Sequence, residues 1–510
     1  MTLNSFCKEL IKTIEKENLS NRKNIERLKK KLAKKHGLSN LPLNSKILEY
    51  AKSKKAKQAL RTKPTRTLSG VSVIAIMCKP APCPGKCIYC PNGSNAPQSY
   101  TGFEPAALRA KMNKFDPYKQ VKNRLKQLKN VGHSTEKNEL IIMGGTFPSL
   151  DQEYKENFVK RAFDAFNNKK ADSLEEAQRI NEKAKNRVIG LTLETRPDYI
   201  NINNFLKFGA TRIELGVQST DPKILEEIKR GHNIKQTIET TKKLKNSGYK
   251  VLYQMMPGLP GSSLKKDIKM FKDLFKNPDF KPDMLKIYPT LIIKGTKLYD
   301  LWKKGQYTPI NEEYSKKLLN EIYKFAPKWV RIMRVQRDIP AKFIEAGPTK
   351  SNLRELIEKE GTETKEIRFR EAGHSMIKRK KEINKIEILV EEYKASEGKE
   401  FFISAEDKKA DILMGFGRLR IPSQTKIRPE INSKTALLRE LHVYGSSTSL
   451  GKKGNVQHRG WGSKILSKAE EIAKKESKTE MIIISGVGVR EYYKKLGYQK
   501  KGPYMWKKIL

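Results

Sequence analysis

The sequence predicts an α/β protein: a partial (β/α) barrel of parallel strands, followed by a smaller α+β domain and preceded by a basic helical region. From about residue 70 to 335, short β-rich runs alternate with amphipathic helical stretches. Such alternation is typical of parallel sheets. Beyond residue 385 the β-rich runs follow one another through short turns, which indicates a mixed or antiparallel sheet. The expected divisions are residues 1–66, 67–335, a linker at 336–384, and 385–510.

The first 66 residues carry 19 Lys and Arg against 5 Glu. Ile25, Leu28 and Leu32 recur at helical spacing, so we predict a short, basic, helical region. Its charge makes it a candidate RNA-binding arm. The alternative is a solvated, charged helix pair that only packs on the rest of the chain.

The barrel is expected to hold seven strands, with amphipathic helices between them. Functional side chains in such barrels lie at the C-terminal ends of the strands. The predicted strands are 71–77, 139–143, 188–194, 211–218, 249–256, 283–289 and 329–335. The clearest predicted helices are 106–130, 154–167, 234–246 and 264–275.

The chain of 510 residues has 105 Lys and Arg against 56 Asp and Glu, a formal charge of +49. This excess favours a polyanionic partner, although a lysine-rich proteome would also produce it. No apolar run approaches the roughly 18 residues that a membrane span needs, and the beginning of the chain lacks the apolar core of a signal peptide. We therefore expect a cytoplasmic protein with no membrane partner.

Four of the five cysteines lie between residues 78 and 90, directly after the first predicted strand. Cys83, Cys87 and Cys90 are spaced C-x3-C-x2-C, which allows three thiolates to ligate three irons of one [4Fe-4S] cluster. The fourth iron is then open to bind S-adenosylmethionine, whose cleavage gives a 5′-deoxyadenosyl radical. We predict that Cys78 is a neighbour of this cluster and not a ligand.

Two other metal sites are compatible with the same cysteines. A structural zinc would use Cys78 as a fourth ligand, but zinc ribbons usually present two C-x2-C pairs far apart in sequence. A closed electron-transfer cluster is the second alternative, and the ferredoxin spacing C-x2-C-x2-C does not match. The spacing and the place after a first strand favour the open cluster.

Polar and glycine residues follow several other predicted strands. Gly144 and Gly145, with Thr146 after them, would let the backbone approach the amino-acid moiety of S-adenosylmethionine closely. Individually, such residues could equally form a plain turn or structural ion pairs; together they indicate the lining of a barrel mouth. The other lining residues are Glu194, Arg196, Gln218 and Lys286.

A second site is predicted near the C-terminus, where a Q-x-x-G-x-G loop leads into an amphipathic helix. Such a loop exposes backbone N–H groups that suit a pyrophosphate, and this one resembles the coenzyme A loop of GNAT acetyltransferases. In that family the preceding strand contacts the pantetheine, and a tyrosine lies near the thioester; a tyrosine packed under the last strand is the alternative. The loop residues are Gln457, Gly460, Gly462, Ser463 and Lys464; the strand residues are Leu441, His442, Val443 and Tyr444; the tyrosines are Tyr492 and Tyr493.

Nearly the whole chain beyond residue 66 resembles the catalytic subunit of Elongator in its stand-alone archaeal form. The resemblance implies a partial radical SAM barrel with a GNAT-like domain. The motifs that carry it, in order, are SYTGFEP, MGGTFPSL, LETRPDY, RIELGVQS, KRGH, MMPGLPG, KIYPTLIIKGT, RVQRDIP, LHVYG and SGVGVREYYKKLGY.

This resemblance also implies an activity. The family forms the carboxymethyl group at C5 of wobble uridine-34 in tRNA, using acetyl-CoA and the deoxyadenosyl radical. The implied partners are the tRNA anticodon stem-loop, acetyl-CoA and an electron donor for the cluster; whether the chain forms a homo-oligomer is open. Lys137 resembles a family lysine associated with acetyl-CoA, although it could equally be a surface lysine.

The chain departs from the family pattern in the linker. Relatives usually carry cysteines there for a zinc ion, but the matching stretch, 365–373, has none. We therefore predict no zinc and a linker held by ordinary packing.

Two other functions are compatible with parts of the sequence. A protein lysine acetyltransferase would keep the iron–sulfur cluster only as structure. A tRNA-binding scaffold without activity would be expected to lack the cluster ligands and the glycine loop, yet both are present.

Overall fold

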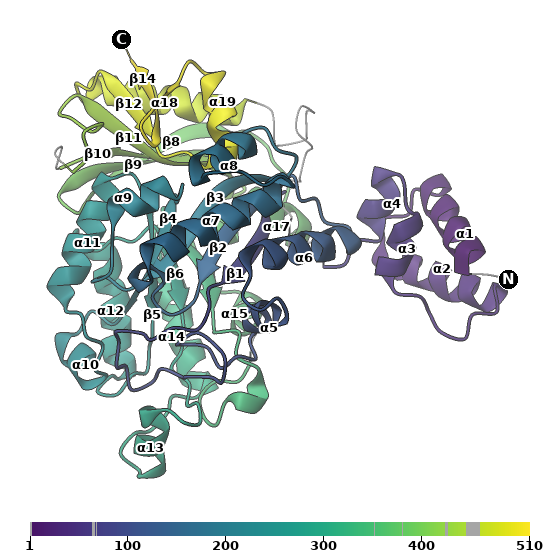
Figure 1. Cartoon of the computed structure of the whole chain (residues 1–510), viewed down its shortest axis with the longest axis horizontal. Helices are drawn as coiled ribbons and strands as arrows, with labels where there is room; N and C mark the ends of the chain where they lie inside the picture. Colours follow the sequence, from purple (N-terminus) through teal and green to yellow (C-terminus); the bar gives the residue numbers. More distant parts are fainter. Residues whose placement is uncertain are drawn as a thin grey trace.

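The computed structural model describes most of the chain. Figure 1 shows the N-terminal helices as a small lobe beside a large body, whose C-terminal strands lie at one end. Within the described residues, no helix is long and apolar enough to cross a bilayer. The described residues are 3–63, 67, 69–350, 352–379, 381–423, 427–444 and 460–509.

The N-terminal lobe is helical, as predicted, and has a hydrophobic core of its own. Phe6, Leu10, Ile25 and Leu32 are buried in this core, and Leu28 packs against its edge. The lobe therefore buries its apolar face internally. Its helices are α1 (Leu3–Lys16), α2 (Arg22–Lys35), α3 (Asn44–Tyr50) and α4 (Lys54–Ala59).

The large body is built on a sheet of seven parallel strands in sequence order, which confirms the predicted partial barrel. The first and last of these strands are its edges, so an open seam separates them. The strands are β1 (Ser72–Met77), β2 (Lys137–Met143), β3 (Arg187–Thr195), β4 (Arg212–Gln218), β5 (Lys250–Met255), β6 (Met284–Ile287) and β7 (Arg331–Val335).

Helices connect these strands and cover the outside of the barrel (Figure 1). The first of them are α5 (Pro105–Met112), α6 (Pro117–Asn130), the 3₁₀ turn η2 (Phe147–Ser149), α7 (Gln152–Asn167), α8 (Leu174–Asn181) and α9 (Ile202–Lys207). The others are α10 (Pro222–Glu227), α11 (Ile234–Asn246), α12 (Leu264–Lys276), α13 (Lys297–Lys303) and α14 (Glu312–Phe325).

The prediction of one continuous helix over 106–130 was wrong, because α5 and α6 are separate. Lys114 and Phe115 have φ values of +50° and +57°, which no α-helix accommodates. Asp116 caps α6, and Pro117 occupies its first turn. A proline disfavours helical backbone at the residue before it and is well placed at a helix start, so it separates the two helices here.

The segment after β7 forms short helices, and those of residues 367–378 pack against the C-terminal sheet. Glu366 binds the backbone N–H of Ile332 at 3.1 Å, which fixes this segment to β7. Its elements are the 3₁₀ turn η3 (Ala341–Phe343), α15 (Leu353–Lys359), α16 (Ile367–Arg370) and α17 (Ala372–Lys378).

The C-terminal part forms a mixed sheet of seven strands in the order β13-β14-β12-β11-β10-β9-β8. Only the β11–β12 pair is parallel; the predicted α+β character is thereby confirmed. Its elements are β8 (Glu387–Ala395), β9 (Gly398–Asp407), β10 (Ile412–Ile421), β11 (Thr435–Val443), α18 (Trp461–Lys475), β12 (Glu480–Ile483), η4 (Val487–Val489), α19 (Arg490–Lys494), β13 (Gln499–Lys501) and β14 (Tyr504–Lys508).

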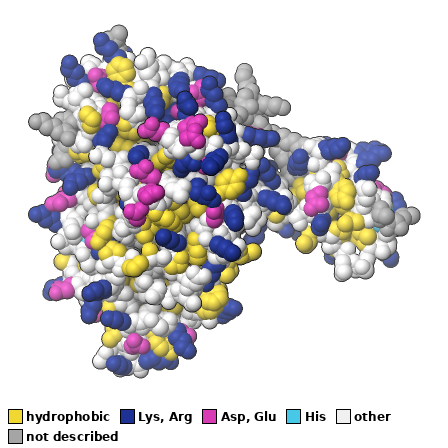
Figure 2. Space-filling view, in the orientation of Figure 1, with side chains coloured by type: hydrophobic (Ala, Val, Ile, Leu, Met, Phe, Trp, Pro, Cys, Tyr) yellow, Lys and Arg dark blue, Asp and Glu magenta, His cyan; other side chains and the backbone are white. Residues whose placement is uncertain are grey.

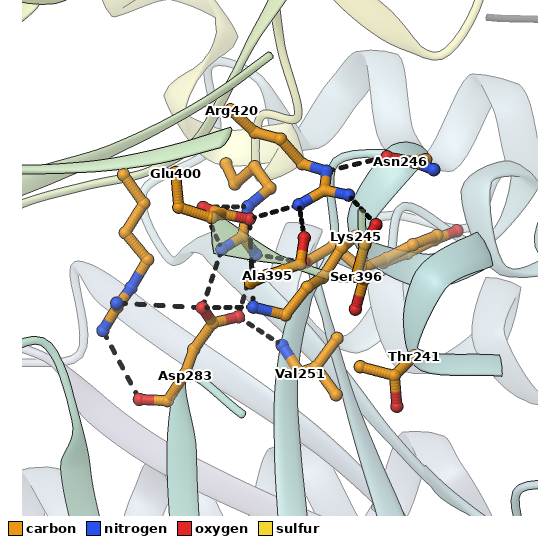
Figure 3. Close-up of polar contacts among 12 residues, drawn as sticks. Thr241, Lys245, Asn246, Val251, Asp283, Ala395, Ser396, Glu400 and Arg420 are labelled. Carbon is orange, nitrogen blue, oxygen red and sulfur yellow. Dashed lines mark hydrogen bonds and ion pairs between the residues drawn. The ribbon is translucent and has the colours of Figure 1, made fainter. Parts of the chain in front are cut away.

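This sheet joins the barrel through a group of buried charges that we call the interface cluster (Figure 3). Asp283, just before β6, accepts hydrogen bonds from both terminal nitrogens of Arg439 at 2.7 and 2.8 Å. Glu400 accepts hydrogen bonds from Arg439 at 2.7 Å and from Arg420 at 2.8 Å. Lys245 of α11 lies 3.6 Å from Asp283.

The C-terminal sheet therefore covers the N-terminal ends of the barrel strands. Two further contacts agree: Arg331, the first residue of β7, donates to the Tyr444 hydroxyl at 2.8 Å, and Arg490 lies 3.1 Å from Glu182, which follows α8. The loop with the cysteines follows the C-terminal end of β1. The two predicted sites thus belong to opposite ends of the barrel.

Candidate active site

Two of the three expected iron ligands accept hydrogen bonds from well-defined donors. The backbone N–H of Gly85 donates to Cys83 Sγ at 3.4 Å. Arg230 Nη1 donates to Cys87 Sγ at 3.3 Å. Arg230 is itself held by the carbonyl oxygen of Gly216 in β4, at 3.1 Å from Nε. Donors of this kind stabilise a thiolate, which is the form that ligates metals.

The third cysteine, Cys90, lies close to the other two. Gln98 Nε2 donates to Cys90 Sγ at 3.5 Å. Burial is the main cause that raises the pKa of Cys90, and the charges of Cys87 and Cys83 raise it further. Three sulfurs that repel one another as thiolates are stabilised together by a bound cation.

Cys78 has different surroundings. Its side chain is buried, and its Sγ donates a hydrogen bond to the carbonyl oxygen of Gly144 at 3.5 Å. Burial raises the pKa of this thiol to about 12. A protonated thiol in the core packs as a small apolar group. These observations support the prediction that Cys78 is a neighbour of the cluster.

The donor set fits an iron–sulfur cluster better than a single zinc ion. Among the described residues, no group of three or more His, Cys, Asp or Glu side chains is arranged to hold one ion. Each Zn–S bond is about 2.3 Å, so two thiolates on one zinc lie at most about 4.6 Å apart. The ligands of a [4Fe-4S] cluster bind different irons and stand further apart. Three cysteines on one loop, each accepting a hydrogen bond from a separate donor, are compatible with the larger group.

The loop after β2 passes directly beside the cysteine loop. Gly144 has a φ of +120° and Gly145 a φ of +51°, conformations that favour glycine. A Cβ atom on Gly144 would lie only 2.7 Å from Cys78 Sγ, so a larger residue would displace that loop. The Thr146 hydroxyl lies 3.6 Å from Cys83 Sγ. The predicted glycine loop and the cysteines are therefore brought together.

Charged residues fill the interior of the barrel. Lys286 Nζ lies 3.2 Å from Glu194 Oε1 and also binds Glu214. Gln254 donates to Glu194 at 3.5 Å and to Glu214 at 3.4 Å. Arg212 Nε lies 3.4 Å from Glu214. The structure therefore brings together Glu194 and Lys286, which the sequence predicted only as separate strand ends.

The protonation of this group follows from burial and pairing. Burial raises the pKa of Glu194, and the attraction of Lys286 opposes this only in part. Burial would also raise the pKa of Glu214, but Lys286 and Arg212 lower it below its ordinary value. Glu214 is therefore the anion that Lys286 pairs with most strongly, and Glu194 is the carboxyl group that gains a proton more easily.

Tyr100 connects this interior group to the loop that carries the cysteines. Its hydroxyl donates to Glu194 Oε2 at 3.0 Å. Tyr100, Glu214 and Arg230 lie in the motifs SYTGFEP, RIELGVQS and KRGH but were not among the predicted site residues. Glu214 occupies an inward position on β4, a fully buried strand. A charged residue in such a strand is rarely buried without a partner, and this could have identified Glu214 as a candidate site residue.

Two predicted lining residues offer buried polar atoms to the mouth of the barrel. Arg196 binds Asp198 through Nε at 2.9 Å and through Nη2 at 2.6 Å. Its Nη1 and the Oε1 of Gln218 are buried, and within the described residues neither has a hydrogen-bond partner. Gln218 also has a φ of +72°. Buried polar atoms of this kind need a partner, which a bound ligand can provide.

The C-terminal domain brings part of the second predicted site together. A Cβ atom on Gly462 would lie 2.8 Å from the Tyr492 hydroxyl and 3.8 Å from Val443. Tyr492 is 38% exposed; burial raises its pKa, while a hydrogen bond with the Ser463 side chain acts in the opposite direction. Gly460 starts α18 with a φ of +80°. Gln457 lies outside the described residues.

The other members of this predicted set lie nearby but differ in accessibility. Tyr493 is only 5% exposed and packs against Tyr498, with ring centroids 6.0 Å apart. The Lys464 ammonium group lies 4.6 Å from the centre of the Trp461 ring. Of the two tyrosines, Tyr492 is thus the accessible one, while Tyr493 matches the alternative of a packed tyrosine.

The end of β11 separates from its parallel neighbour. The β11–β12 pairing runs only to Leu438 and Ile483. Beyond it, residues 441–443 pair with β10 on the other side. The backbone groups of this stretch that face β12 have no ladder partner within the described strands. The rings of His442 and Tyr444 are tilted by 33° with centroids 4.3 Å apart.

Lys137 lies apart from the other barrel residues of the predicted site. It is the first residue of β2, and it pairs in register with Arg187 at the start of β3. A Cβ atom on Gly488 of the C-terminal domain would lie 2.6 Å from Arg187 Cβ. Burial lowers the pKa of Lys137. This lysine is therefore at the end of the barrel that faces the C-terminal domain.

Comparisons with known proteins agree with this architecture. The chain matches the family models for the ELP3 N-terminal domain over residues 3–68, the Radical SAM superfamily over residues 82–274, and the Radical_SAM C-terminal domain over residues 282–363. Radical SAM enzymes carry a [4Fe-4S] cluster and use S-adenosylmethionine, so the family implies both cofactors.

Similar proteins extend over nearly the full length. The "tRNA uridine(34) acetyltransferase" of Methanocaldococcus jannaschii is 51% identical, over 95% of this chain and 94% of the relative. "Elongator complex protein 3" of Schizosaccharomyces pombe is 42% identical, over 98% and 97%. A solved structure of Methanocaldococcus infernus Elp3 with an N-terminal deletion has a TM-score of 0.78 at 47% identity, covering 87% of this chain and 100% of that one. The chain therefore belongs to the radical SAM superfamily and, within it, to the family of Elongator complex protein 3 and the archaeal tRNA uridine(34) acetyltransferases.

Proposed function

We propose that this enzyme modifies uridine-34 of tRNA and builds a carboxymethyl group at C5 from the acetyl group of acetyl-CoA. The observation that carries the proposal is the set of three hydrogen-bonded cysteine sulfurs at one barrel end, in a chain whose C-terminal domain has a separate candidate acyl-CoA site. The full-length similarity to proteins named for uridine-34 supports the substrate.

At the cysteine end, Cys83, Cys87 and Cys90 would hold the cluster. With S-adenosylmethionine bound, the cluster supplies a 5′-deoxyadenosyl radical. Hydrogen bonds from Arg230 and Gly85 would orient two of the ligand sulfurs. These residues prepare the site before any substrate arrives.

The rest of the mouth would bind and orient the ligands. Gly144 and Gly145 allow close approach of backbone to an amino-acid moiety. Arg196 Nη1 and Gln218 Oε1 would complete their hydrogen bonding on a bound ligand. Glu194 and Lys286 would fix the polar floor of the mouth, because each is held by a buried partner.

At the other end, the separated end of β11 would bind the pantetheine through the backbone of residues 441–444. The N-terminus of α18, with Gly460 and Gly462, would bind the pyrophosphate. Tyr492 would lie near the thioester, because its exposed hydroxyl is close to Gly462 and Val443. Lys137 faces this domain and would help to position the acetyl group.

The charge distribution supports RNA as the substrate. The chain carries a formal charge of +49, and Figure 2 shows Lys and Arg side chains over both the N-terminal lobe and the large body. Phosphate contacts from such residues give salt-dependent affinity without sequence preference. We propose that the basic N-terminal lobe contributes to this binding, in a cytoplasmic enzyme that takes electrons from a separate donor.

The test is a reconstituted reaction followed by nucleoside mass spectrometry. The anaerobically loaded enzyme is incubated with tRNA, acetyl-CoA, S-adenosylmethionine and dithionite. We expect 5-carboxymethyluridine at position 34, and no product when acetyl-CoA is omitted. Acetyl-lysine on protein without any modified uridine would instead establish a protein acetyltransferase.

A further inference from the structure

Two phenylalanine rings stack across the open seam of the barrel, at the end that carries the cysteines. Phe103 follows β1 in the chain, and Phe343 lies in η3, which follows β7. Their ring centroids are 4.2 Å apart, with an interplanar angle of 21°. Arg337 also crosses the seam and donates to the carbonyl oxygen of Ser99. The edge strands are thus bridged at this one rim.

The outer side of this aromatic pair is exposed to solvent. Phe103 is 44% exposed, whereas Phe343 packs against a small core cluster that includes Ile339. Leu108 and Met112 of the adjoining α5 are also exposed, at 43% and 81%. Of these exposed side chains, only Phe103 belongs to the stacked pair, and an exposed aromatic ring at the edge of a site is a candidate contact for a ligand. We call Phe103 and Phe343 the aromatic rim.

Two lysines accompany the aromatic rim. Lys111 Nζ lies 5.5 Å from the centroid of Phe103, and Lys342 Nζ lies 5.1 Å from that of Phe343. Aromatic faces with adjacent cations are the combination that binds single-stranded nucleic acid, because bases stack on the rings and phosphates pair with the cations. The charge pattern therefore favours RNA over an apolar protein segment.

The aromatic rim lies close to the interior of the mouth. Tyr100, three residues before Phe103, reaches inward and donates to Glu194 at 3.0 Å. Three residues span at most about 10 Å of chain. A base on the aromatic rim and a base inside the mouth would thus be close neighbours along one RNA strand.

We propose that the aromatic rim is a stacking platform for an unstacked anticodon-loop base next to the target uridine, with Lys111 and Lys342 contacting the flanking phosphates. This rests on the proposed function, because it assumes an RNA substrate. A lysine over an exposed ring contributes about two- to fivefold to a binding constant, whereas a stacked base contributes about 5- to 100-fold. We therefore expect a base to displace the two ammonium groups from the outer faces of the phenylalanine rings, which leaves these groups free to contact phosphates.

The experiment measures binding of an anticodon stem-loop RNA to the full chain by fluorescence anisotropy at several salt concentrations. Phe103→Ala should weaken binding about 5- to 100-fold with the salt slope unchanged, and Phe103→Tyr should restore it. Lys111→Gln should weaken binding severalfold and reduce the salt slope by about one. Met112→Ala is the matched control, since it removes a more exposed apolar side chain without a ring.

A second readout reports stacking directly. The stem-loop carries the fluorescent base 2-aminopurine beside position 34, and its emission should be quenched by the wild type and by Phe103→Tyr but not by Phe103→Ala. Equal weakening by Met112→Ala, or unchanged quenching with Phe103→Ala, would overturn the proposal and indicate a protein-docking patch. If wild type modifies tRNA but Phe103→Ala binds normally, only this inference fails; if the wild type binds no stem-loop, the proposed RNA substrate fails with it.

Discussion

Both ends of the barrel bury charged and polar side chains, but these side chains differ in which of their atoms have hydrogen-bond partners. In the interface cluster, Asp283 and Glu400 are each bonded directly to arginine side chains, notably Arg439 (Figure 3). At the cysteine end, Arg196 Nη1 and Gln218 Oε1 are buried without partners among the described residues. Arginine–carboxylate bonds hold the two domains together, although Lys245 Nζ within the cluster makes ion pairs without a hydrogen bond among the described residues. At the barrel mouth, the open hydrogen-bonding positions are available to a ligand.

The largest expected effect tests the cysteine end. Replacing Cys83, Cys87 or Cys90 by Ser should abolish 5′-deoxyadenosine formation, because each loss removes one of three iron ligands. Cys78→Ser should keep most of the iron, because the Cys78 thiol is buried and donates to the carbonyl oxygen of Gly144. Iron content and deoxyadenosine yield are measured after anaerobic loading. Equal iron loss in all four variants would contradict the three-ligand site.

The second effect tests the interface cluster. Asp283→Asn leaves Arg439 buried with only part of its partners, which should lower the free energy of unfolding by about 3–5 kcal/mol. The measurement is chemical denaturation, followed at the transition that includes the C-terminal domain. Glu313→Gln is the control, because its pair with Lys317 is exposed and should contribute little to stability. If Asp283→Asn and Glu313→Gln lowered the free energy of unfolding equally, the interface cluster would not be what holds the two domains together.

The third effect sharpens the comparison, because one charge in the interface cluster is in excess. Burial lowers the pKa of Lys245 to about 8, although Asp283 and Glu400 act against this. Because the pKa of Lys245 is lower in the folded than in the unfolded state, its protonated form destabilises the folded protein, and this cost is complete below about pH 8. The cost falls as the pH rises and disappears near the unfolded pKa of about 10.4. Lys245→Met should therefore stabilise the protein by about 2–3 kcal/mol at pH 7.

The difference between wild type and Lys245→Met should shrink as the pH rises from 8 to about 10.4. Free energies of unfolding are compared at matched pH values, so that other titrating groups cancel. A difference that does not change with pH would mean that the pKa of Lys245 is the same in the folded and unfolded states.

The smallest effect concerns the acyl-CoA site in the C-terminal domain. Tyr492→Phe should slow acetyl-CoA turnover about tenfold, the usual effect of losing one positioned hydrogen bond. Tyr493→Phe should change turnover little, because that ring is buried among other side chains. Thiol release from acetyl-CoA is measured in the presence of tRNA, and gel shift checks that RNA affinity is unchanged. A larger loss of turnover in Tyr493→Phe than in Tyr492→Phe would assign the position near the thioester to Tyr493 instead.

Much of the fold could be predicted because its signals are local. Alternating β-rich and helical stretches predicted all seven barrel strands to within a few residues. The break between α5 and α6 was missed, although Pro117 marks it, because the apolar spacing continues across the turn. The C-x3-C-x2-C spacing likewise predicted three ligands from a single short loop.

The sequence by itself determined where the strands lie along the chain, the cysteine loop and the glycine motifs, because these depend on neighbours within a few residues. Only the tertiary structure decided that Lys286 pairs with Glu194 and Glu214, since β3, β4 and β6 come together only when the barrel forms. It also showed Cys78 buried and donating to Gly144, and it placed Lys137 at the end of the barrel opposite to the cysteines. Burial and pairing are properties of long-range contacts, which local residue patterns do not contain.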